Sequence, residues 1–438
     1  MSENRQSERF NQLLVLLSMY IGYAVFMVLR MCPAPVSNSI LSDPALDIDK
    51  GDWGRILAMG TAGAVIGKFV AGYAADRLGG RITFTAGLVV CSCGIAAFSQ
   101  ATSAWMFQAA FFVALMAKSA GWPAMARIVG QSFRPAEFGR VWGILSTSSR
   151  VGTMGVTFGL GLLIGTVSWP NLLLIAGGVG LVTAVAFNVS QTTAASRLAA
   201  CRLQSTEPGV NEVSYSGHPL DGTSLRTAIG RFCMCPRFWL IVGSLATLTV
   251  LWDFLLFVPI FLRENMGMTE RAAAVASNAF PLGSLISVLC GGFVFDLLSR
   301  RSTAWMMGGL LLTAAGCIGA FYLMPTLSVS NQTAAEMSVG LLFVFGLCIA
   351  PCYYIPMSVF SIQFGGPHAG FLVGTLDAVA FFVNAVFYWF AGELAEQSWS
   401  LFLVVLGAVA VMSAVMTFSF MLAEARHAER HGGIHTVS

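Results

Sequence analysis

A small set of ionisable residues interrupts stretches of this sequence that are otherwise apolar. The cations all lie in the first half of the chain, and the carboxylates all lie in the second half. The cations are Arg30, Lys68, Lys118, Arg127 and Arg150, and the carboxylates are Asp253 and Asp377. Each such charge costs about 2.5–3.5 kcal/mol at the centre of a membrane helix, so we expect these residues to line water or to pair.

The residue types suggest two kinds of chemistry. Arginine grips a carboxylate or phosphate at two points, whereas lysine acts as a point charge. We therefore expect Arg30, Lys68, Lys118 and Arg150 to converge on a central anion-binding cavity. Arg127 lies nine residues after Lys118, which is about half a turn round one continuous helix, so we assign it a structural role.

The two carboxylates are candidates for carrying protons. If Asp377 pairs with Arg150 across the empty cavity, an anionic ligand would compete for Arg150 and free Asp377 to take up a proton. Asp253 is expected to lie nearer the outer rim and to contribute less. Four aromatic residues are expected to wall the cavity, namely Tyr23, Trp122, Tyr353 and Tyr354.

The composition shows which elements must hold these residues. Of 438 residues, 56% are hydrophobic and only 10% are charged, against about 25% charged in ordinary soluble proteins. Together with a mean hydropathy of +0.75, this excludes a soluble enzyme, a disordered chain and a disulfide-stapled secreted domain.

Charge-poor apolar runs recur along the whole chain, and each is long enough to cross a bilayer as a helix. They do not alternate as the strands of a membrane barrel do. The predicted crossings are 11–38, 53–75, 82–100, 104–128, 138–166, 169–190, 237–262, 272–298, 303–324, 335–360, 368–392 and 397–423. Arginines gather in the loops on the side of the two termini, so both termini are predicted to be cytoplasmic.

The predicted domains are an N-terminal six-helix bundle (1–190), a cytoplasmic linker (191–236), a C-terminal six-helix bundle (237–423) and a cytoplasmic tail (424–438).

A motif repeats at the same place in both bundles, with a glycine four residues before an aspartate and arginines after it. We expect the glycines to permit close helix packing and the charges to act in gating. The motif residues are Gly72, Asp76, Arg77 and Arg81 in the first half, and Gly292, Asp296 and Arg300 in the second.

This pattern resembles the major facilitator superfamily along essentially all twelve helices. The resemblance implies two pseudo-symmetric bundles round a central cleft that opens alternately to either side. The runs GYAVFMVLR, AVIGKFVAG and AGWPAMAR are also similar to the organophosphate:phosphate antiporter family, and this narrower resemblance implies that Arg30 and Lys68 bind an anion. Two positions depart from the pattern, because Leu251 stands where that family has an arginine and Ser149 where it has a histidine.

The sequence lacks the residues that several other functions would require. The pairs Cys91/Cys93 and Cys233/Cys235 have no histidine partners at zinc spacing, so no metal or other cofactor is predicted. No phosphate-cradling glycine loop is present, which argues against a nucleotide-driven pump. The linker arginines favour contact with lipid over nucleic acid. We therefore expect a monomeric, multi-pass protein of the plasma (inner) membrane without enzymatic activity.

The favoured function is secondary transport of a small organic anion, phosphorylated or carboxylated, coupled to protons or to a counter-anion. The latter case includes organophosphate/phosphate antiport. An exporter of amphipathic or cationic compounds is the alternative, with Asp253 and Asp377 binding the cation. A receptor built on a transporter body is a third, weaker possibility, since the sequence offers no extramembrane domain to signal with.

Overall fold

The computed structural model describes residues 2–134, 137–204, 220, 223–327, 330–365 and 368–430. The described chain is almost entirely helical and divides into two compact units. Unit 1 comprises residues 1–48 and 59–212, and unit 2 comprises residues 49–58 and 213–438.

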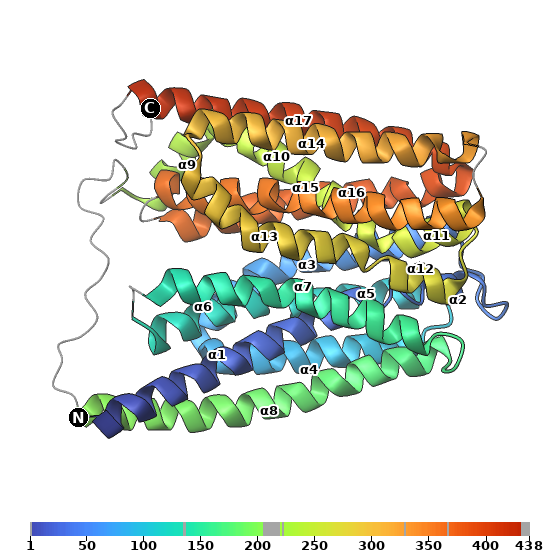
Figure 1. Ribbon diagram of the computed structural model, residues 1–438. Helices are drawn as coiled ribbons and strands as arrows, with labels where there is room; N and C mark the ends of the chain where they lie inside the picture. The colour runs from blue at the N-terminus through green and yellow to red at the C-terminus, as the bar shows by residue number, and fades with distance from the viewer. Residues whose placement is uncertain are drawn as a thin grey trace. The chain divides into compact units, whose positions relative to one another are not determined.

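Unit 1 is built from long helices that run side by side (Figure 1). In it α1 packs against α7 and α8, and α4 packs against α5, α6 and α8. Its helices are α1 (Ser2–Met31), α2 (Ser37–Leu41), the part of α3 (Lys50–Leu78) from Met59 onward, α4 (Gly80–Ser99), α5 (Ala104–Lys118), α6 (Gly121–Ser132), α7 (Phe138–Leu163) and α8 (Trp169–Gln204).

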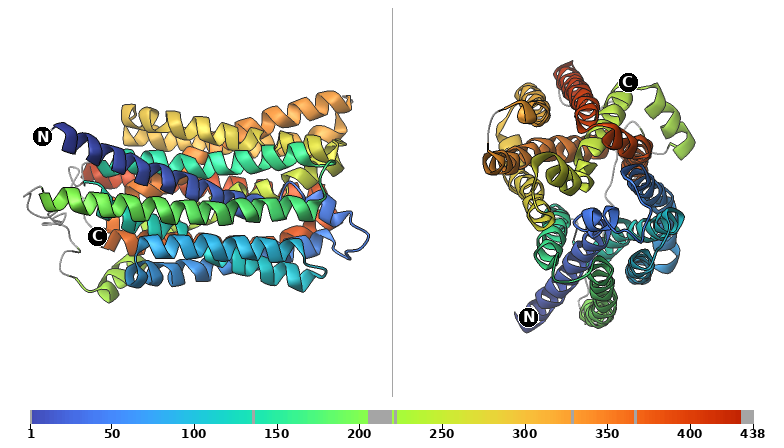
Figure 2. Two further views of the ribbon diagram at one scale, coloured as in Figure 1. Left: turned by 90° about the horizontal axis from the view of Figure 1, so that it is seen from below. Right: turned by 90° about the vertical axis from the view of Figure 1, so that its right-hand side faces the viewer.

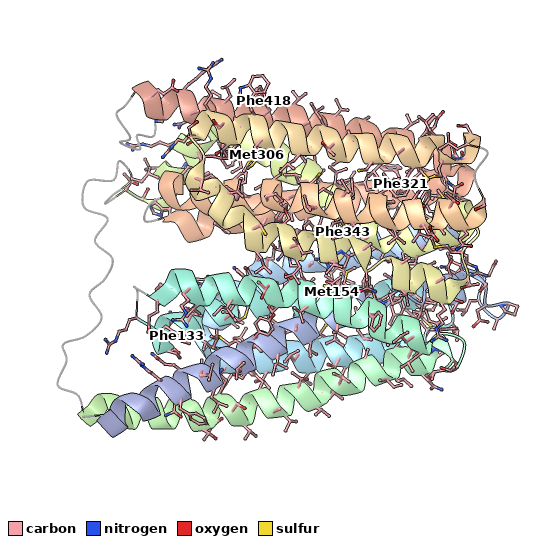
Figure 3. All side chains as sticks on the ribbon, in the orientation of Figure 1. Phe133, Met154, Met306, Phe321, Phe343 and Phe418 are labelled. Carbon is pink, nitrogen blue, oxygen red and sulfur yellow. The ribbon has the colours of Figure 1, made fainter. Side chains whose placement is uncertain are left out.

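Unit 2 repeats this construction, with α14 packed against α17 and α13 against α15 (Figure 2). Phe321 of α14 illustrates its core, with its ring 5.3 Å from that of Phe261 and only 1% of its surface exposed (Figure 3). The helices are α9 (Leu225–Met234), α10 (Pro236–Asp253), α11 (Val258–Met266), α12 (Glu270–Ala276), α13 (Ala279–Leu297), α14 (Arg300–Leu323), α15 (Asn331–Gly365), α16 (Ala369–Gln397) and α17 (Trp399–Arg430), with the 3-10 turns η2 (Phe254–Leu256) and η3 (Met324–Thr326).

The predicted crossings are present as helices. Eleven candidate spans in the described residues are long and apolar enough to cross a membrane. The crossing predicted at 138–166 is α7, a 26-residue helix that falls outside those eleven. Its central run Ser146–Thr147–Ser148–Ser149–Arg150 explains why its hydropathy is low.

The first crossing ends earlier than predicted. We expected it to reach residue 38, but α1 ends at Met31 and the short α2 begins at Ser37. Pro33 and Pro35 account for the difference, because a proline disfavours helical backbone at the residue before it.

After α2, the Asp43 carboxylate accepts hydrogen bonds from the Trp169 indole (2.9 Å) and the Ala45 amide (3.0 Å). These bonds hold the pKa of Asp43 below its usual value.

Three crossings are interrupted. The one predicted as a continuous helix over 104–128 breaks at Ser119–Ala120, between α5 and α6. The half-turn separation of Lys118 and Arg127 assumed one continuous helix, and it stays a prediction. Pro123 explains the break, because its ring clashes with the carbonyl four residues earlier. The crossing at 237–262 breaks after Asp253, and α11 begins five residues later with Val258 and Pro259. The crossing at 272–298 breaks at Ser277–Asn278.

The first turns of α3 belong to unit 2. A Cβ atom on Gly54 would stand 2.6 Å from the Tyr388 carbonyl oxygen and 2.7 Å from the Gly392 nitrogen, so the backbones of α3 and α16 nearly touch there. Ion pairs flank this contact, with Lys50 Nζ 2.9 Å from Glu264 and Arg55 3.1 Å from Glu393.

This contact predicts opposite results for two glycines of α3. Gly54→Leu should lower the melting temperature of the purified protein, because forcing a side chain into a tight contact costs about 1–3 kcal/mol. Gly72→Ala is the matched control, because a Cβ there meets nothing within 4 Å. It should leave the melting temperature unchanged or raise it, since alanine favours helix. Equal melting temperatures for Gly54→Leu and the parent would contradict the tight contact.

Candidate functional site

The anion-binding candidates of unit 1 begin on α1. Arg30 lies in the last turn of the helix and is only 8% exposed. Tyr23 lies seven residues earlier, which places both residues on one face of α1, about 10 Å apart along the helix axis. This face therefore carries a buried guanidinium and a phenol that could contact one ligand.

Arg150 lies in the middle of α7 and is 1% exposed. Its Nη1 donates to the Ser146 carbonyl and to Ser149 Oγ, both at 2.8 Å. A Cβ on Gly152 would collide with the Ala24 carbonyl, so α7 and α1 cross closely two residues beyond Arg150. Gly152 therefore serves close helix packing.

The two lysines flank the crossing of α3 and α5. A Cβ on Gly67 would collide with the Met116 carbonyl, and Lys68 follows Gly67 directly while Lys118 lies two residues after Met116. Both lysines are half-buried. The Lys118 Nζ lies 5.7 Å from the centre of the Tyr23 ring, a cation–π contact that links α5 to α1.

Aromatic rings extend from Tyr23. The Tyr23 ring meets Trp122 edge-on at 5.6 Å, and Trp122 meets Trp142 at 4.7 Å. The structure thus brings together three of the predicted binding residues, Tyr23, Lys118 and Trp122. Sequence reasoning missed Trp142, because only the folded chain places this residue of α7 beside α6.

Asp377 of α16 contacts the predicted aromatic pair of α15. Tyr353 donates a hydrogen bond from its hydroxyl to Asp377 Oδ1 at 3.2 Å, and its ring lies 5.4 Å from that of Tyr354. Trp252 completes the group, with its ring 6.2 Å from Tyr353 and 6.5 Å from Tyr354. Trp252 was also missed, although it stands directly before Asp253 in the sequence.

Asp253 occupies a different environment, at the end of α10 where the helix breaks. Its carboxylate is buried and accepts a hydrogen bond from the Asn384 amide at 2.7 Å. The Tyr388 hydroxyl donates to the Asp253 backbone carbonyl at 2.9 Å and so satisfies a carbonyl that the break releases. Sequence patterns gave no signal for Asn384 or Tyr388. Leu251, two residues earlier, is fully buried.

The repeated motif at the α3–α4 junction is exposed. Asp76 lies 4.0 Å from Arg127, and Arg77 covers the Tyr73 ring at 5.2 Å. Arg81 donates to Thr192 Oγ1 at 2.6 Å. The pair with Asp76 fits the structural role that we expected of Arg127.

The remaining expectations for the repeated motif concern its packing glycine and its second copy. A Cβ on Gly72 would meet nothing within 4 Å, so this glycine does not serve the close helix packing that we predicted. In the second half, the surroundings of Gly292 and the side chain of Asp296 lie outside what the structure describes. Arg300 begins α14 and is exposed.

Two predictions about the site stay predictions, namely the convergence of Arg30, Lys68, Lys118 and Arg150 on one cavity and the pairing of Arg150 with Asp377. Within the described residues, no group of three or more histidines, cysteines, aspartates or glutamates could hold a metal ion. The arrangement can bind an anion in unit 1 and hold a proton on a carboxylate in unit 2.

The chain is similar in amino-acid sequence to proteins named as transporters. The chain is 24% identical to sugar phosphate exchanger 3 of Gallus gallus over 64% of its own length and 60% of that protein's length. It is 22% identical to putative glycerol-3-phosphate transporter 2 of Arabidopsis thaliana over 82% of this chain and 75% of that one. The chain therefore spans less than two thirds of the first of these relatives.

Solved structures share the fold. A bacterial homolog of the human lysosomal transporter Spinster superposes with a TM-score of 0.70 at 18% identity, covering 96% of this chain and 98% of that one. A D-xylose-proton symporter also gives a TM-score of 0.70, at 13% identity and with 93% and 97% covered.

A sequence profile of the Major Facilitator Superfamily matches residues 19–301, which is more than half of the chain. The match agrees with the apolar helices of both units and with the transporter fold of the solved structures. The protein is thus a multi-pass membrane protein, and it belongs to the Major Facilitator Superfamily of membrane transporters.

Proposed function

We propose that the protein is a secondary active transporter of a small organic anion, phosphorylated or carboxylated, in the plasma (inner) membrane. The observation that carries this proposal is the division of charge between the units. The in-membrane cations Arg30, Lys118 and Arg150 lie in unit 1, whereas Asp253 and Asp377 lie in unit 2. Relatives named sugar phosphate exchanger and glycerol-3-phosphate transporter support an anionic substrate.

In this mechanism, unit 1 binds the anion. Arg30 and Arg150 supply guanidinium groups that match a carboxylate or phosphate at two points, and the lysines add positive charge. Their burial strengthens the attraction, because little water competes with the ligand. The anion in turn compensates charges that are costly to leave in a membrane. Alternating access then exposes the loaded site to one side of the membrane and to the other.

Asp377 is the proposed proton carrier. As a carboxylate it accepts the Tyr353 hydrogen bond, and when protonated it can still accept through one oxygen while donating through the other. It can therefore change its protonation state without leaving Tyr353 unpaired. Asp253, fixed by Asn384 at 2.7 Å, is given the smaller role.

Counter-anion exchange is the second candidate for the driving force. The names of the relatives favour it, because sugar phosphate exchanger implies exchange of one anion for another. Uptake of phosphorylated and carboxylated metabolites into proteoliposomes separates the candidates. Accumulation driven by a pH gradient supports proton symport, whereas accumulation that needs a trapped counter-anion supports exchange. If only lipophilic cations move, the anion proposal fails and an exporter of cationic compounds takes its place.

Arg30 should be indispensable for binding. We expect Arg30→Ala to abolish anion binding while the purified protein still folds. Arg30→Lys should bind about tenfold more weakly or worse, because the second charged hydrogen bond is lost and such a bond contributes about 1.5–3 kcal/mol. Isothermal titration with the transported anion measures the affinities, and thermal melting checks the fold. Parental affinity in the lysine variant would rule out two-point contact by Arg30.

Asp377 should couple transport to protons. Asp377→Asn keeps the shape and still accepts the Tyr353 hydrogen bond, but it cannot exchange a proton at neutral pH. We expect counterflow exchange of substrate to survive and accumulation driven by a pH gradient to be lost. Asp253→Asn is the matched control, and it should lose less of the accumulation that is driven by a pH gradient. If Asp377→Asn accumulates substrate as the parent does, protons do not couple through this residue.

A further inference from the structure

In unit 1, a chain of aromatic rings leads away from a membrane-embedded cation. Lys118 Nζ lies over Tyr23 at 5.7 Å, Tyr23 meets Trp122 at 5.6 Å, and Trp122 meets Trp142 at 4.7 Å with 38° between the rings. We call Tyr23, Trp122 and Trp142 the unit 1 ladder. Its members come from α1, α6 and α7, so the ladder exists only in the folded unit.

The ladder differs from the core aromatics of the same unit. The rings of Phe26, Phe84, Phe107 and Phe111 are at most 1% exposed. By contrast, Trp122 is 41% exposed, and Tyr23 and Trp142 are half-buried. The ladder therefore leaves ring surface uncovered within unit 1.

Lys118 indicates which surroundings this ring surface meets. An ammonium group within a crossing is costly against lipid, so Lys118 is expected to face a polar or water-filled space. Tyr23 lies against the ammonium, and Trp122 lies against Tyr23. The exposed rings are therefore best explained as lining the same polar space as the cation. Rings in such a space are costly to leave in water and are available to a ligand.

Unit 2 holds a second group that combines an ionisable side chain with tyrosine and tryptophan rings. Asp377 is hydrogen-bonded to Tyr353, and the Tyr353 ring contacts both Tyr354 and Trp252. Trp252 also meets Phe280 edge-on at 5.6 Å. In each unit, an ionisable side chain touches a tyrosine, and that tyrosine touches a tryptophan.

We propose that the transported anion carries a planar aromatic ring beside its charged group, as an aromatic carboxylate or an aryl phosphate does. This inference rests on the proposed anion transport and specifies its substrate class. The cations of unit 1 bind the charged group, while Trp122 and Trp142 stack on the ring. Aromatic pairs in edge-to-face or offset-stacked arrangements have centroid separations of about 4.5–7 Å, and both ring pairs of the ladder lie in this range. A ligand ring would extend that series.

Three phosphate monoesters test the proposal because they share one charged group. Phenyl phosphate carries an aromatic ring, glucose 6-phosphate carries a saturated polar ring, and glycerol 3-phosphate carries no ring. Isothermal titration of the purified full chain should show phenyl phosphate binding about tenfold more tightly than glycerol 3-phosphate and more tightly than glucose 6-phosphate.

Variants of the ladder assign this preference to its residues. Trp142→Leu should reduce the phenyl phosphate preference to about twofold or less, whereas Trp142→Phe, which retains a ring, should preserve most of it. Trp105→Leu is the matched control, because Trp105 is 69% exposed at the start of α5, and it should keep the parental ratio. Thermal melting of each variant confirms that it is folded.

The outcomes distinguish this inference from the proposal on which it rests. Equal or weaker binding of phenyl phosphate, or a parental ratio in a folded Trp142→Leu protein, overturns the ladder inference and leaves anion transport standing. If glucose 6-phosphate binds most tightly of the three esters, the ladder inference is also overturned. The tryptophans would then pack against a sugar ring of the substrate. If none of the three esters binds, and carboxylates such as benzoate and lactate also do not bind, the proposed function itself fails.

Discussion

The cost of placing a charge inside a membrane governs how this protein is built. Every in-span charge whose contacts are given above has a polar or aromatic partner near it. The contacts are Arg150 with Ser146 and Ser149, Lys118 with Tyr23, Asp377 with Tyr353, and Asp253 with Asn384. At the helix break after Asp253, the Tyr388 hydroxyl likewise satisfies the backbone carbonyl that the break releases.

The sequence predicts the architecture well because the physical signal is strong and local. A run of about twenty apolar residues has few alternatives to a crossing helix, so the predicted crossings all appear as helices. The ends and interruptions of helices were harder to predict. Hydropathy does not register the turn at Ser119–Ala120 or the early end of α1 at Met31, because both depend on how nearby prolines are accommodated.

The site could be predicted only in part. The charged residues could be identified from the sequence, because Arg30, Arg150 and Asp377 stand out in apolar surroundings. Their partners did not, since Trp142 and Asn384 are ordinary residues until the fold places them beside Trp122 and Asp253. Gly72 shows the opposite error, because its repeated motif suggested packing and the structure leaves it in open space. Sequence patterns therefore locate costly groups better than they locate the contacts that make those groups useful.

The central claim is that the cations of unit 1 bind an organic anion. The change in melting temperature of the purified protein tests it directly, because a ligand that binds the folded state stabilises it by mass action. Measured against a panel of organic anions and a panel of lipophilic cations, our account predicts that at least one phosphorylated or carboxylated anion raises the melting temperature and that this rise disappears in Arg30→Ala. A rise with lipophilic cations alone, unaffected by Arg30→Ala, would contradict the account.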